Sequence, residues 1–523
     1  MVSASYASFT DDEFTALQSA YASLQESHHA LQQRVAELQR QVAWFQNQLF
    51  GRKSEQRYAD GDTQQLSLGV AASNSLTPTP ETREVRYLRS RGKQPLAGAV
   101  NETGLRFDAT VPVKEIRVLP PEVKDLEDGE YTVIGENVSH RLAQRPGAYV
   151  VLKYVHPVIK LKDQRLVSAP ATVQVLEKCY ADVSLLAGML TDKFVYHLPL
   201  YRIHQRLKAA GIELARPTLT TWVHRAIALL EPVYDAQFTG ILESAQLAMD
   251  ETPIKAARKA PGQMQTGYFW PVYGERDEVV FPFAPNRGAH NVPALLRGFK
   301  GRLLTDGYVA YDKYAAQVTT VTHAHCWAHL RRMFLKAEDA EPERTQRALE
   351  YIRLLYYHET ELKEHALTDE KRLRHRTEHS KPVVDALFDW LEEQMTDRSL
   401  LPKDPFTQAV AYALQRKASL SVFLAHPEVP LDTNHLERAL RVIPMGRKSW
   451  LFCWTEVGAQ YVGIIQSLLV TCKLQGVDPY DYLVDVLQRI SGHPASRAHE
   501  LTPRLWKQHF ADNPLRSPLY HTP

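Results

Sequence analysis

The chain is 523 residues long, 44% of them hydrophobic, and its 62 Lys and Arg nearly balance 60 Asp and Glu to leave a formal net charge of +2. This length exceeds one ordinary hydrophobic core, so several domains are expected, and the near-neutral total gives no sign of a nucleic-acid partner. Without an apolar run near the roughly 18 residues of a membrane span, or the basic-then-apolar order of a signal peptide, the sequence predicts a soluble cytoplasmic protein with no membrane partner.

Residues 1–51 carry a heptad pattern. Positions separated alternately by three and four residues run from Phe14 to Leu49, and all of them are apolar except His28. This narrow seam, with flanks rich in Gln, Glu and Arg, predicts a coiled coil, so residues 14–49 are expected to join copies of the chain in a homo-oligomer. The alternative is one amphipathic helix that docks on its own chain.

The next two segments differ in composition. Residues 52–110 lack periodicity and are rich in Gly, Ser, Thr, Gln and Pro, which predicts a flexible linker. Residues 111–178 contain β-branched and aromatic runs that predict a small β-rich module. Its expected short strands are Tyr131–Ile134, Ala148–Leu152 and Val158–Leu161.

Residues 179–238 have the pattern of a helical, helix-turn-helix-like module. One helix passes through Leu207 and ends at Gly211, and a second begins near Thr218, whose hydroxyl is expected to cap it. The basic excess suits contact with DNA phosphates, although such helix pairs are also common in proteins that do not bind DNA. The candidate DNA-binding residues are Arg202, Arg206, Lys208, Arg216 and Trp222.

Residues 239–475 are expected to form an α/β catalytic core in which strands end in acids. The strand from Ala245 ends in Asp250, a hairpin follows over residues 266–283, and a later strand ends in Asp306. With a short helix between them and a further strand at 318–322, the order is that of a ribonuclease-H-like mixed sheet.

A long helical insertion, at about 335–428, separates this sheet from the third acid of interest. That acid is Glu437, in the first turn of a later helix, and a helical tail follows over residues 476–523. The insertion is strongly acidic, since residues 338–397 hold 16 acids and 9 bases, whereas residues 193–225 carry +5 and residues 438–455 carry +4. The near-neutral total therefore conceals basic segments around the acids and an acidic insertion, which we expect to face solvent or to discourage misplaced DNA.

The first and fourth strands of a ribonuclease-H-like sheet are neighbours, so Asp250 and Asp306 are expected to lie side by side, with Glu437 converging on them. Three carboxylates suit two Mg²⁺ (or Mn²⁺) ions and phosphoryl transfer. Each acid alone also has an ordinary interpretation: the aspartates as turn residues and Glu437 as a capping-box partner of Asn434. Glu251 is expected to point to the opposite strand face and to lie outside the site.

Basic and aromatic side chains follow Glu437 without an intervening acid. Their alternation suits a DNA groove, and a buried aromatic stripe is a compatible alternative. The candidate DNA-binding residues are Arg438, Arg441, Arg447, Lys448 and Trp450. The segment 446–449 lacks the spacing of a phosphate-binding loop, so no nucleotide cofactor is indicated.

Cys326 and His329 form a C-x-x-H half-site followed by two further candidate DNA-binding residues, Arg331 and Arg332. The half-site has no matching second pair, and the chain's four cysteines form no C-x-x-C pair, so no zinc is expected. A structural or DNA-end-positioning role for Cys326 and His329 is favoured over metal binding.

These motifs resemble transposases of the insertion-sequence-66 (IS66) family. The segments that carry the resemblance are Met249–Pro253, Thr305–Tyr308, Cys326–Arg332, Asn434–Arg441, Gly446–Phe452 and Lys473–Tyr480. It extends from the N-terminal heptads, through Leu49–Ser54, almost to the C-terminus.

The resemblance implies a DDE transposase of a bacterial mobile element, with Asp250, Asp306 and Glu437 matching the catalytic acids. The implied reaction is Mg²⁺-dependent cleavage at the element ends, followed by attack of the 3′-hydroxyl on target DNA, and small accessory proteins of the same element are implied partners. When bound to DNA, such a protein is nucleoid-associated. Many members carry a cysteine-rich zinc module where residues 111–178 have no cysteine, so zinc is not carried over.

Two other functions remain compatible with the sequence. One is a DNA-binding regulator or inactive remnant of a transposase, and the other is a nuclease on the same fold that does not transpose, because fold does not determine function. The intact acids and the full-length resemblance favour the active transposase.

Overall fold

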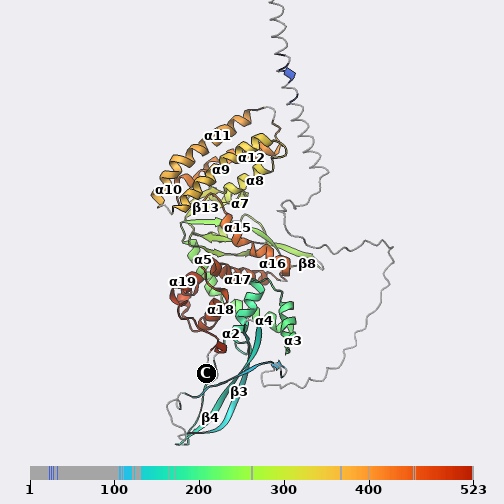
Figure 1. Ribbon diagram of the computed structural model, residues 1–523, viewed down its shortest axis with the longest axis vertical. Helices are drawn as coiled ribbons and strands as arrows, with labels where there is room; N and C mark the ends of the chain where they lie inside the picture. The colour runs from blue at the N-terminus through green and yellow to red at the C-terminus, as the bar shows by residue number, and fades with distance from the viewer. Residues whose placement is uncertain are drawn as a thin grey trace, which may run out of the picture.

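The computed structural model describes residues 105–520 with short gaps, and five helical residues before them. The gaps are residues 108, 110, 121–122, 124–130, 146, 163, 171, 173, 261–262, 366–367, 398–399, 451–452 and 454, and the five residues are 23, 25, 27, 28 and 32. The predicted coiled coil over 14–49 and the linker over 52–110 therefore lie almost entirely outside the described residues and stay predictions. Figure 1 shows an elongated molecule, with a helical layer at one end, a sheet below it, more helices beneath the sheet and a long β-hairpin at the other end.

The hairpin module is built from two strands that are much longer than predicted. Its elements are β2 (Val113–Arg117), β3 (Tyr131–Arg145), β4 (Ala148–Leu161) and β5 (Leu166–Ser168). β3 pairs antiparallel with β4 from Tyr131↔Leu161 to Arg145↔Ala148, with one irregularity between Val133 and Gly135. Most of β3 is exposed or half-buried, so backbone pairing extends the strand where the side chains show no apolar alternation, and the predicted short strands were wrong in length.

Four helices follow: α2 (Val183–Phe194), α3 (Leu200–Ala209), α4 (Arg216–Leu229) and α5 (Glu231–Leu242). The turn between α3 and α4 includes Gly211 at φ +78° and the short strand β6 (Ile212–Glu213), which pairs with β1 (Arg106–Phe107). The second helix of the pair begins at Arg216, and no side chain caps it, so the prediction of a Thr218 cap was wrong. Pro217 lies in the first turn of this helix, and its fixed φ already suits the helical conformation.

The central sheet has five strands in the order β11-β10-β7-β13-β14. They are β7 (Gln246–Met249), β10 (Val272–Gly274), β11 (Glu278–Val280), β13 (Gly301–Thr305) and β14 (Val321–His325). β10 runs antiparallel to both its neighbours, whereas β13 runs parallel to both β7 and β14. The molecule is thus a mixed α/β protein, as predicted.

Two helices connect strands of this sheet, and the sequence predicted only one. The short helix α6 (Asn291–Leu295) precedes β13, and α7 (Val309–Gln317) joins β13 to β14. Parallel neighbours cannot be joined by a tight turn, so a crossover helix is required there. The predicted strand at 318–322 accordingly starts later, at Val321.

The predicted hairpin over residues 266–283 divides between two sheets. A second, three-stranded sheet contains β8 (Thr252–Ala260), β9 (Gln263–Phe269) and β12 (Phe283–Ala284). The chain passes from β9 to β10 at Trp270 and Pro271; Trp270 is fully buried, and Pro271 has no N–H to continue a ladder.

Alternate side chains of the central strands pack against different helices. Leu247, Met249 and Leu303 pack in the cluster that includes α6 and α7. Ala248 packs instead in the cluster that includes α17 (Glu456–Leu474), and Leu304 in the cluster that includes α8 (Trp327–Leu335). The two strands end at Met249 and Thr305, so the residues that follow them, Asp250 and Asp306, lie at one edge of the sheet.

The predicted insertion is mostly helical in its described part. After α8 it contains α9 (Pro342–Glu364), α10 (Asp369–His375), the π-helical turn η2 (Arg376–Ser380), α11 (Lys381–Thr396), α12 (Pro405–Gln415), α13 (Lys417–Leu420) and α14 (Val422–Ala425). Helices α9, α11, α12, α13 and α14 share one apolar cluster with Trp327 and Ala324, which attaches the layer to the β14 side of the sheet.

The chain returns to the sheet through α15 (Asn434–Leu440) and α16 (Val442–Trp450) and ends in α17, α18 (Pro479–Arg489), η3 (Ala495–Leu501), α19 (Pro503–His509) and η4 (Pro518–Tyr520). By length and composition α17 could span a membrane, which the sequence analysis did not anticipate, but 67% of its apolar window is buried inside the molecule. Its apolar character is accounted for by packing against α4, α5 and β11.

Candidate active site

Asp250 and Asp306 directly follow two neighbouring strands. β7 and β13 are parallel and pair Ala248 with Leu304, so each aspartate lies two residues beyond the paired residue of its own strand, at the same edge of the sheet. The backbone N–H of Glu251 donates to Asp250 Oδ1 at 2.7 Å, and that of Tyr308 donates to Asp306 Oδ1 at 2.9 Å. The strands and these local turns thus bring the two predicted acids together.

Glu251 joins this pair, contrary to the prediction that excluded it. One ligand oxygen from each of Asp250, Glu251 and Asp306 lies within 4.8 Å of the other two. Glu251 does extend toward α7, where Tyr311 donates to its Oε2 at 2.8 Å and Arg287 binds its Oε1. The strand ends at Met249, however, so strict alternation no longer separates residue 251 from residue 250.

We call Asp250, Glu251 and Asp306 the acidic edge. Burial makes the negative charges of Asp250 and Glu251 costly. Burial and then the charge of Glu251 raise the pKa of Asp250 to about 7, with smaller contributions from Asp306 and Glu437. Burial and the charge of Asp306 also raise the pKa of Glu251, although Tyr311 and Arg287 oppose this rise. The edge therefore holds more negative charge than its surroundings neutralise.

Glu437 lies near this edge but not within it. It acts on the pKa of Asp250, but its Oε1 is 3.3 Å from the Arg332 guanidinium and 3.8 Å from Nε2 of His329. Both partners belong to α8. The structure thus brings two of the three predicted acids together with Glu251 and leaves the third paired with basic side chains beside them.

The helix that carries Glu437 is held at its start by Asp432, so the Glu437 carboxylate is not needed to cap it. Asp432 accepts from the backbone N–H of Asn434 at 3.0 Å and from the Tyr356 hydroxyl at 2.8 Å. Asp432 rather than Glu437 therefore satisfies the start of α15, and the capping-box interpretation of Glu437 was wrong.

Cys326 anchors the same segment from the other side. Its Sγ accepts from the backbone N–H and the hydroxyl of Thr433, both at 3.4 Å, and the backbone N–H of Trp327 donates to Leu431 at 2.9 Å. Cys326 is buried, and burial raises the pKa of its thiol. The C-x-x-H motif thus joins the start of α8 to the segment before α15, with His329 one turn later beside Glu437.

Two hollows that share Arg332 are rich in basic groups, and one of them is lined by Asp306. One, of about 310 Å³, is lined by Asp306 and by Arg287, His329, Arg332 and Lys336. A neighbouring hollow of about 550 Å³ is lined by Arg331, Arg332 and Arg353, among others. Basic groups next to acids suit a substrate with a phosphate backbone.

The candidate DNA-binding residues of the α3–α4 pair divide into surface and core. Arg202 and Lys208 are exposed, and exposed Arg216 lies over the Tyr201 ring at 5.3 Å. Arg206 is engaged by Asp192 and by the Tyr149 hydroxyl. Trp222 is 4% exposed and packs against Tyr180, so the prediction that it contacts DNA was wrong: this helix buries the face that holds the indole.

The candidates on α15 and α16 are mostly at the surface. Arg438, Arg441 and Lys448 are exposed, and Arg447 donates to the carbonyl of Pro253 at 2.5 Å. Trp450 is only partly exposed, since it packs over Gly446 and under the Lys193 ammonium, 5.6 Å from its ring. It is a packing residue in this structure, whereas the other aromatic residues of the predicted stripe lie outside the described residues.

Sequence reasoning missed the groups that hold Glu251. Arg287 lies over the Tyr308 ring at 4.1 Å, and the Tyr308 hydroxyl donates to the Arg287 carbonyl at 2.6 Å. Tyr311 is fully buried in α7, the helix that was not predicted. The only sequence signal for this group of side chains was the position of Tyr308, two residues after Asp306.

Comparisons with known proteins decide the family. A model of the IS66 transposase family matches residues 178–461, and a model of the IS66 C-terminal element matches residues 467–504. The chain belongs to the IS66 transposase family. A third model, described as transposase C of IS166 homeodomain, matches residues 37–116.

This IS66 chain is also similar to three uncharacterized proteins of Sinorhizobium fredii. It is 32% identical to y4hP over 72% of this chain and 71% of that one, and 30% identical to y4qI over 74% of each. The identity to y4jD is 28%, over 85% of this chain and 88% of the relative. The family models support a transposase role.

Proposed function

We propose that this protein is a DDE-type DNA transposase that binds the ends of a bacterial insertion sequence, cleaves there and joins the 3′-hydroxyl ends to target DNA. The observation that carries the proposal is the acidic edge: partly buried carboxylates that follow two parallel neighbouring strands, with the pKa of Asp250 raised to about 7, beside a basic helix. Strongly perturbed acids in a concave site indicate function rather than packing.

The strand order supports a ribonuclease-H-like core. Numbered along the chain, the five central strands lie in the order 3-2-1-4-5, and the second is antiparallel to the rest. In this arrangement the first and fourth strands are central neighbours, and these are the strands that precede Asp250 and Asp306. Glu437 lies beside the same edge on α15, beyond the helical insertion, where its charge acts on Asp250.

The residues of the acidic edge fit divalent cations. Their oxygens are hard ligands within 4.8 Å of one another, and their unneutralised charge is the property that Mg²⁺ or Mn²⁺ would relieve. Asp250 and Asp306 would hold the metal, two ions being expected, with Glu437 released from Arg332 as the third ligand. When bound, such ions stabilise charge on the attacking and leaving oxygens of a phosphodiester.

The chain's own side chains account for substrate positioning. Arg332 and Lys336 line the hollow next to Asp306 and would contact the phosphates that flank the reacting bond. Arg287 and Tyr311 hold Glu251, and Cys326 holds the segment before Glu437. These contacts keep the acids oriented before DNA arrives.

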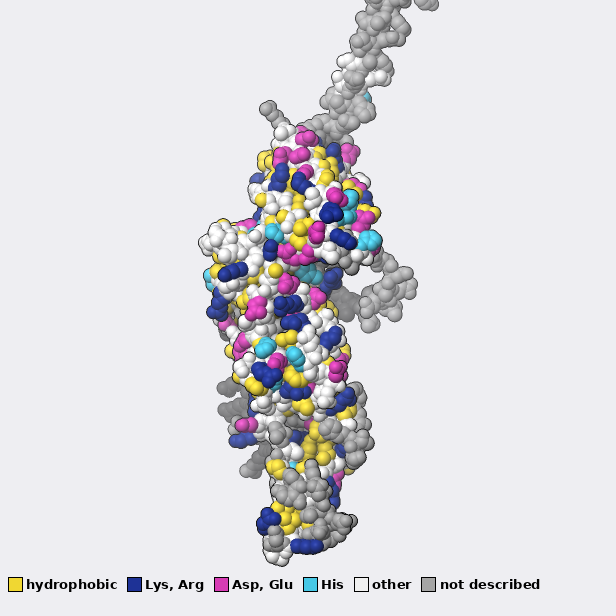
Figure 2. Space-filling view, turned by 90° about the vertical axis from the view of Figure 1, so that its left-hand side faces the viewer, with side chains coloured by type: hydrophobic (Ala, Val, Ile, Leu, Met, Phe, Trp, Pro, Cys, Tyr) yellow, Lys and Arg dark blue, Asp and Glu magenta, His cyan; other side chains and the backbone are white. Residues whose placement is uncertain are grey.

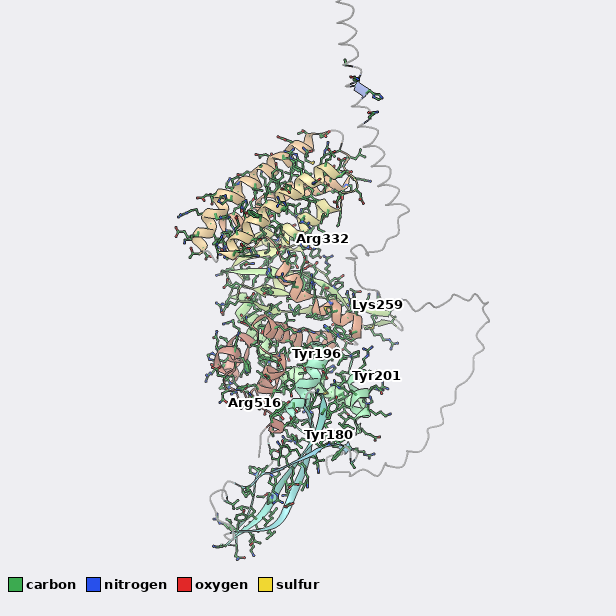
Figure 3. The ribbon with its side chains drawn as sticks, in the orientation of Figure 1. Tyr180, Tyr196, Tyr201, Lys259, Arg332 and Arg516 are labelled. Carbon is green, nitrogen blue, oxygen red and sulfur yellow. The ribbon has the colours of Figure 1, made fainter. Side chains whose placement is uncertain are left out.

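A path for DNA is supported by exposed groups along one side of the molecule. In Figure 3, Arg332, Lys259 and Tyr201 follow one another down the same side, from the helical layer to α3. Arg438, Arg441 and Lys448 on α15 and α16 are exposed between these modules. We infer that the element end lies along this side and that α3 and α4 bind its outer part.

The partners beyond DNA follow from the sequence. The heptads over residues 14–49 would pair copies of the chain, because joining two element ends to one target requires two active sites held together. Small accessory proteins of the same element are further proposed partners, and the bacterial cytoplasm, at the nucleoid, is the proposed location.

The test is cleavage and joining with full-length protein. Wild type should nick an element-end duplex in Mg²⁺ or Mn²⁺ and produce strand-transfer products, whereas Asp250→Ala should reduce nicking by about 10³-fold or more, as expected when a group that stabilises the transition state is removed. Equal nicking by both proteins would refute the catalytic assignment. Tight binding without cleavage would support the inactive regulator, and cleavage without joining would support the nuclease.

A further inference from the structure

The helical insertion contains a second group of metal-ligating side chains, distinct from the acidic edge. His358 and Glu361 lie one turn apart on α9, and His375 and His379 lie one turn apart where α10 passes into η2. Residues spaced by three or four positions share one helix face. The rings of His358, His375 and His379 lie with centroids 4.4–5.7 Å apart, so the two helices bring these faces together.

Three of these side chains have the spacing of ligands around one small cation. Nδ1 of His358 is 3.4 Å from Oε2 of Glu361, and Nε2 of His375 is 3.8 Å from the same oxygen. One ligand atom from each residue lies within 4.8 Å of the others. Ligands bound tetrahedrally to zinc at about 2.1 Å lie about 3.4 Å apart, so binding would require only small side-chain movements.

His375 provides independent evidence that this group is a site. Its Nε2 is buried and has no hydrogen-bond partner among the described residues, although it faces Glu361. A buried nitrogen without a partner is costly unless something binds it.

The scaffold beneath the group is rigid. Glu359, next to His358, forms a two-pronged buried ion pair with Arg376, next to His375, through contacts of 2.7 and 2.9 Å. Arg376 is 1% exposed and also donates to the carbonyl of Phe423 at 2.6 Å. A pair that fixes α9 against η2 directly beside the ligands preorganises them.

We propose that His358, Glu361 and His375 bind a Zn²⁺-like divalent cation, with His379 or water in the fourth position. Two imidazoles and a carboxylate suit zinc, whereas the all-oxygen acidic edge suits magnesium. The net negative charge of residues 338–397 favours any cation there. Figure 2, which faces the side of the helical layer where Figure 1 labels α10, shows histidine side chains at its surface among acidic and basic ones. The sequence predicted no zinc because it lacks the cysteine pairs of common zinc sites. The site proposed here contains no cysteine, so that argument does not apply to it.

The test uses full-length protein in which Asp250→Asn and Asp306→Asn weaken metal binding at the acidic edge. After removal of metal by a chelator, Zn²⁺ alone is titrated in competition with a chromophoric chelator. This background protein should bind one Zn²⁺ tightly, and His375→Ala or Glu361→Gln should each weaken that binding at least about 10-fold. His365→Ala is the matched control, because His365 is exposed on the end of the same helix and outside the group, and it should bind as the background does.

Two further measurements keep the result interpretable. Zn²⁺ should raise the melting temperature of the background and control proteins but not of Glu361→Gln, which preserves side-chain shape and guards against a misfolded alanine variant. Co²⁺ should give the visible absorption of a four- or five-coordinate ion in the background protein and not in His375→Ala. Equal Zn²⁺ affinity in all variants, or loss of binding in His365→Ala, would overturn the assignment.

Discussion

Two groups of titratable side chains flank the end of β13, and both have the geometry to hold a cation. One is the acidic edge, and the other is the balanced group, defined as Asp312, His323, His325 and Arg416. In the balanced group, Asp312 lies 3.3 Å from His323 and 3.6 Å from Arg416, and Arg416 donates to His325 at 3.2 Å. The two groups differ in whether positive charge is already supplied by the protein.

The acidic edge therefore requires a cation to neutralise its charge, whereas the balanced group is already neutralised by its own side chains. Burial would raise the pKa of Asp312, but the hydrogen bond from His323 and the charge of Arg416 help to outweigh it, and that pKa is lowered. In the acidic edge, burial and like charge act together and raise the pKa of Asp250 to about 7. Proximity of ligand atoms is therefore not sufficient to identify a metal site; the sign of the local charge decides.

The largest expected effect is on stability at the acidic edge. Because the pKa of Asp250 is raised in the folded protein, the folded state keeps a proton that the unfolded chain releases between about pH 4 and pH 7. The free energy of unfolding of metal-free protein should thus fall as pH rises through this range, by at most about 4 kcal/mol from this group. Asp250→Asn should remove the dependence, and Mg²⁺ should oppose it in wild type.

Urea unfolding at pH 5, 6, 7 and 8, with chelator and with Mg²⁺, measures this effect. Asp512→Asn is the matched control, because Asp512 is exposed in the C-terminal tail, and it should behave as wild type. The assignment fails if wild type and Asp250→Asn lose stability equally as pH rises.

Glu251 is either a metal ligand or only a partner of Arg287, and two variants distinguish these roles. Glu251→Gln keeps an oxygen for Tyr311 and removes the charge, so the Mg²⁺ or Mn²⁺ concentration required for nicking should rise about 10- to 100-fold. Arg287→Ala, which leaves the carboxylate in place, should change that requirement much less. If both variants shift the metal requirement equally, Glu251 acts only through Arg287.

The sequence predicted the site residues that directly follow a regular strand pattern and missed those that lie beyond such patterns. Asp250 and Asp306 were predicted because an apolar strand that ends in an acid places that acid at the carboxyl edge of a sheet. Glu251 was excluded by strand alternation, although the strand had already ended at Met249. Arg287 and Tyr311 approach from a loop and from an unpredicted helix, and such long-range contacts leave no local pattern.

The fold shows the same limit. The helical insertion and the mixed α/β core were predicted because their apolar periods are long and regular. The length of β3 was not, because an exposed strand is held by its backbone partner, and α7 was not, because only the parallel pairing of β13 with β14 requires it. Trp222 was assigned to DNA by residue type, and its burial against Tyr180 depends on tertiary packing.

The smallest expected effect comes from the balanced group. Asp312→Asn should leave the metal requirement for nicking within about 3-fold of wild type, because a cation would have to displace the Arg416 guanidinium that already neutralises it. The pH dependence of this group should have the opposite sign. Burial, and then the charge of His323, lower the pKa of His325 to about 3, so its contribution to stability is present above about pH 6.5 and is lost as pH falls.

The variant His325→Gln isolates that contribution. Wild type should lose about 1 kcal/mol of unfolding free energy between pH 6.5 and pH 5.5 from this residue, and His325→Gln should lose correspondingly less. Urea unfolding over that interval measures the difference, with the exposed His509→Ala as control. If Asp312→Asn instead raised the metal requirement as much as Glu251→Gln, the balanced group would itself bind the cation, and local charge would not distinguish the two groups.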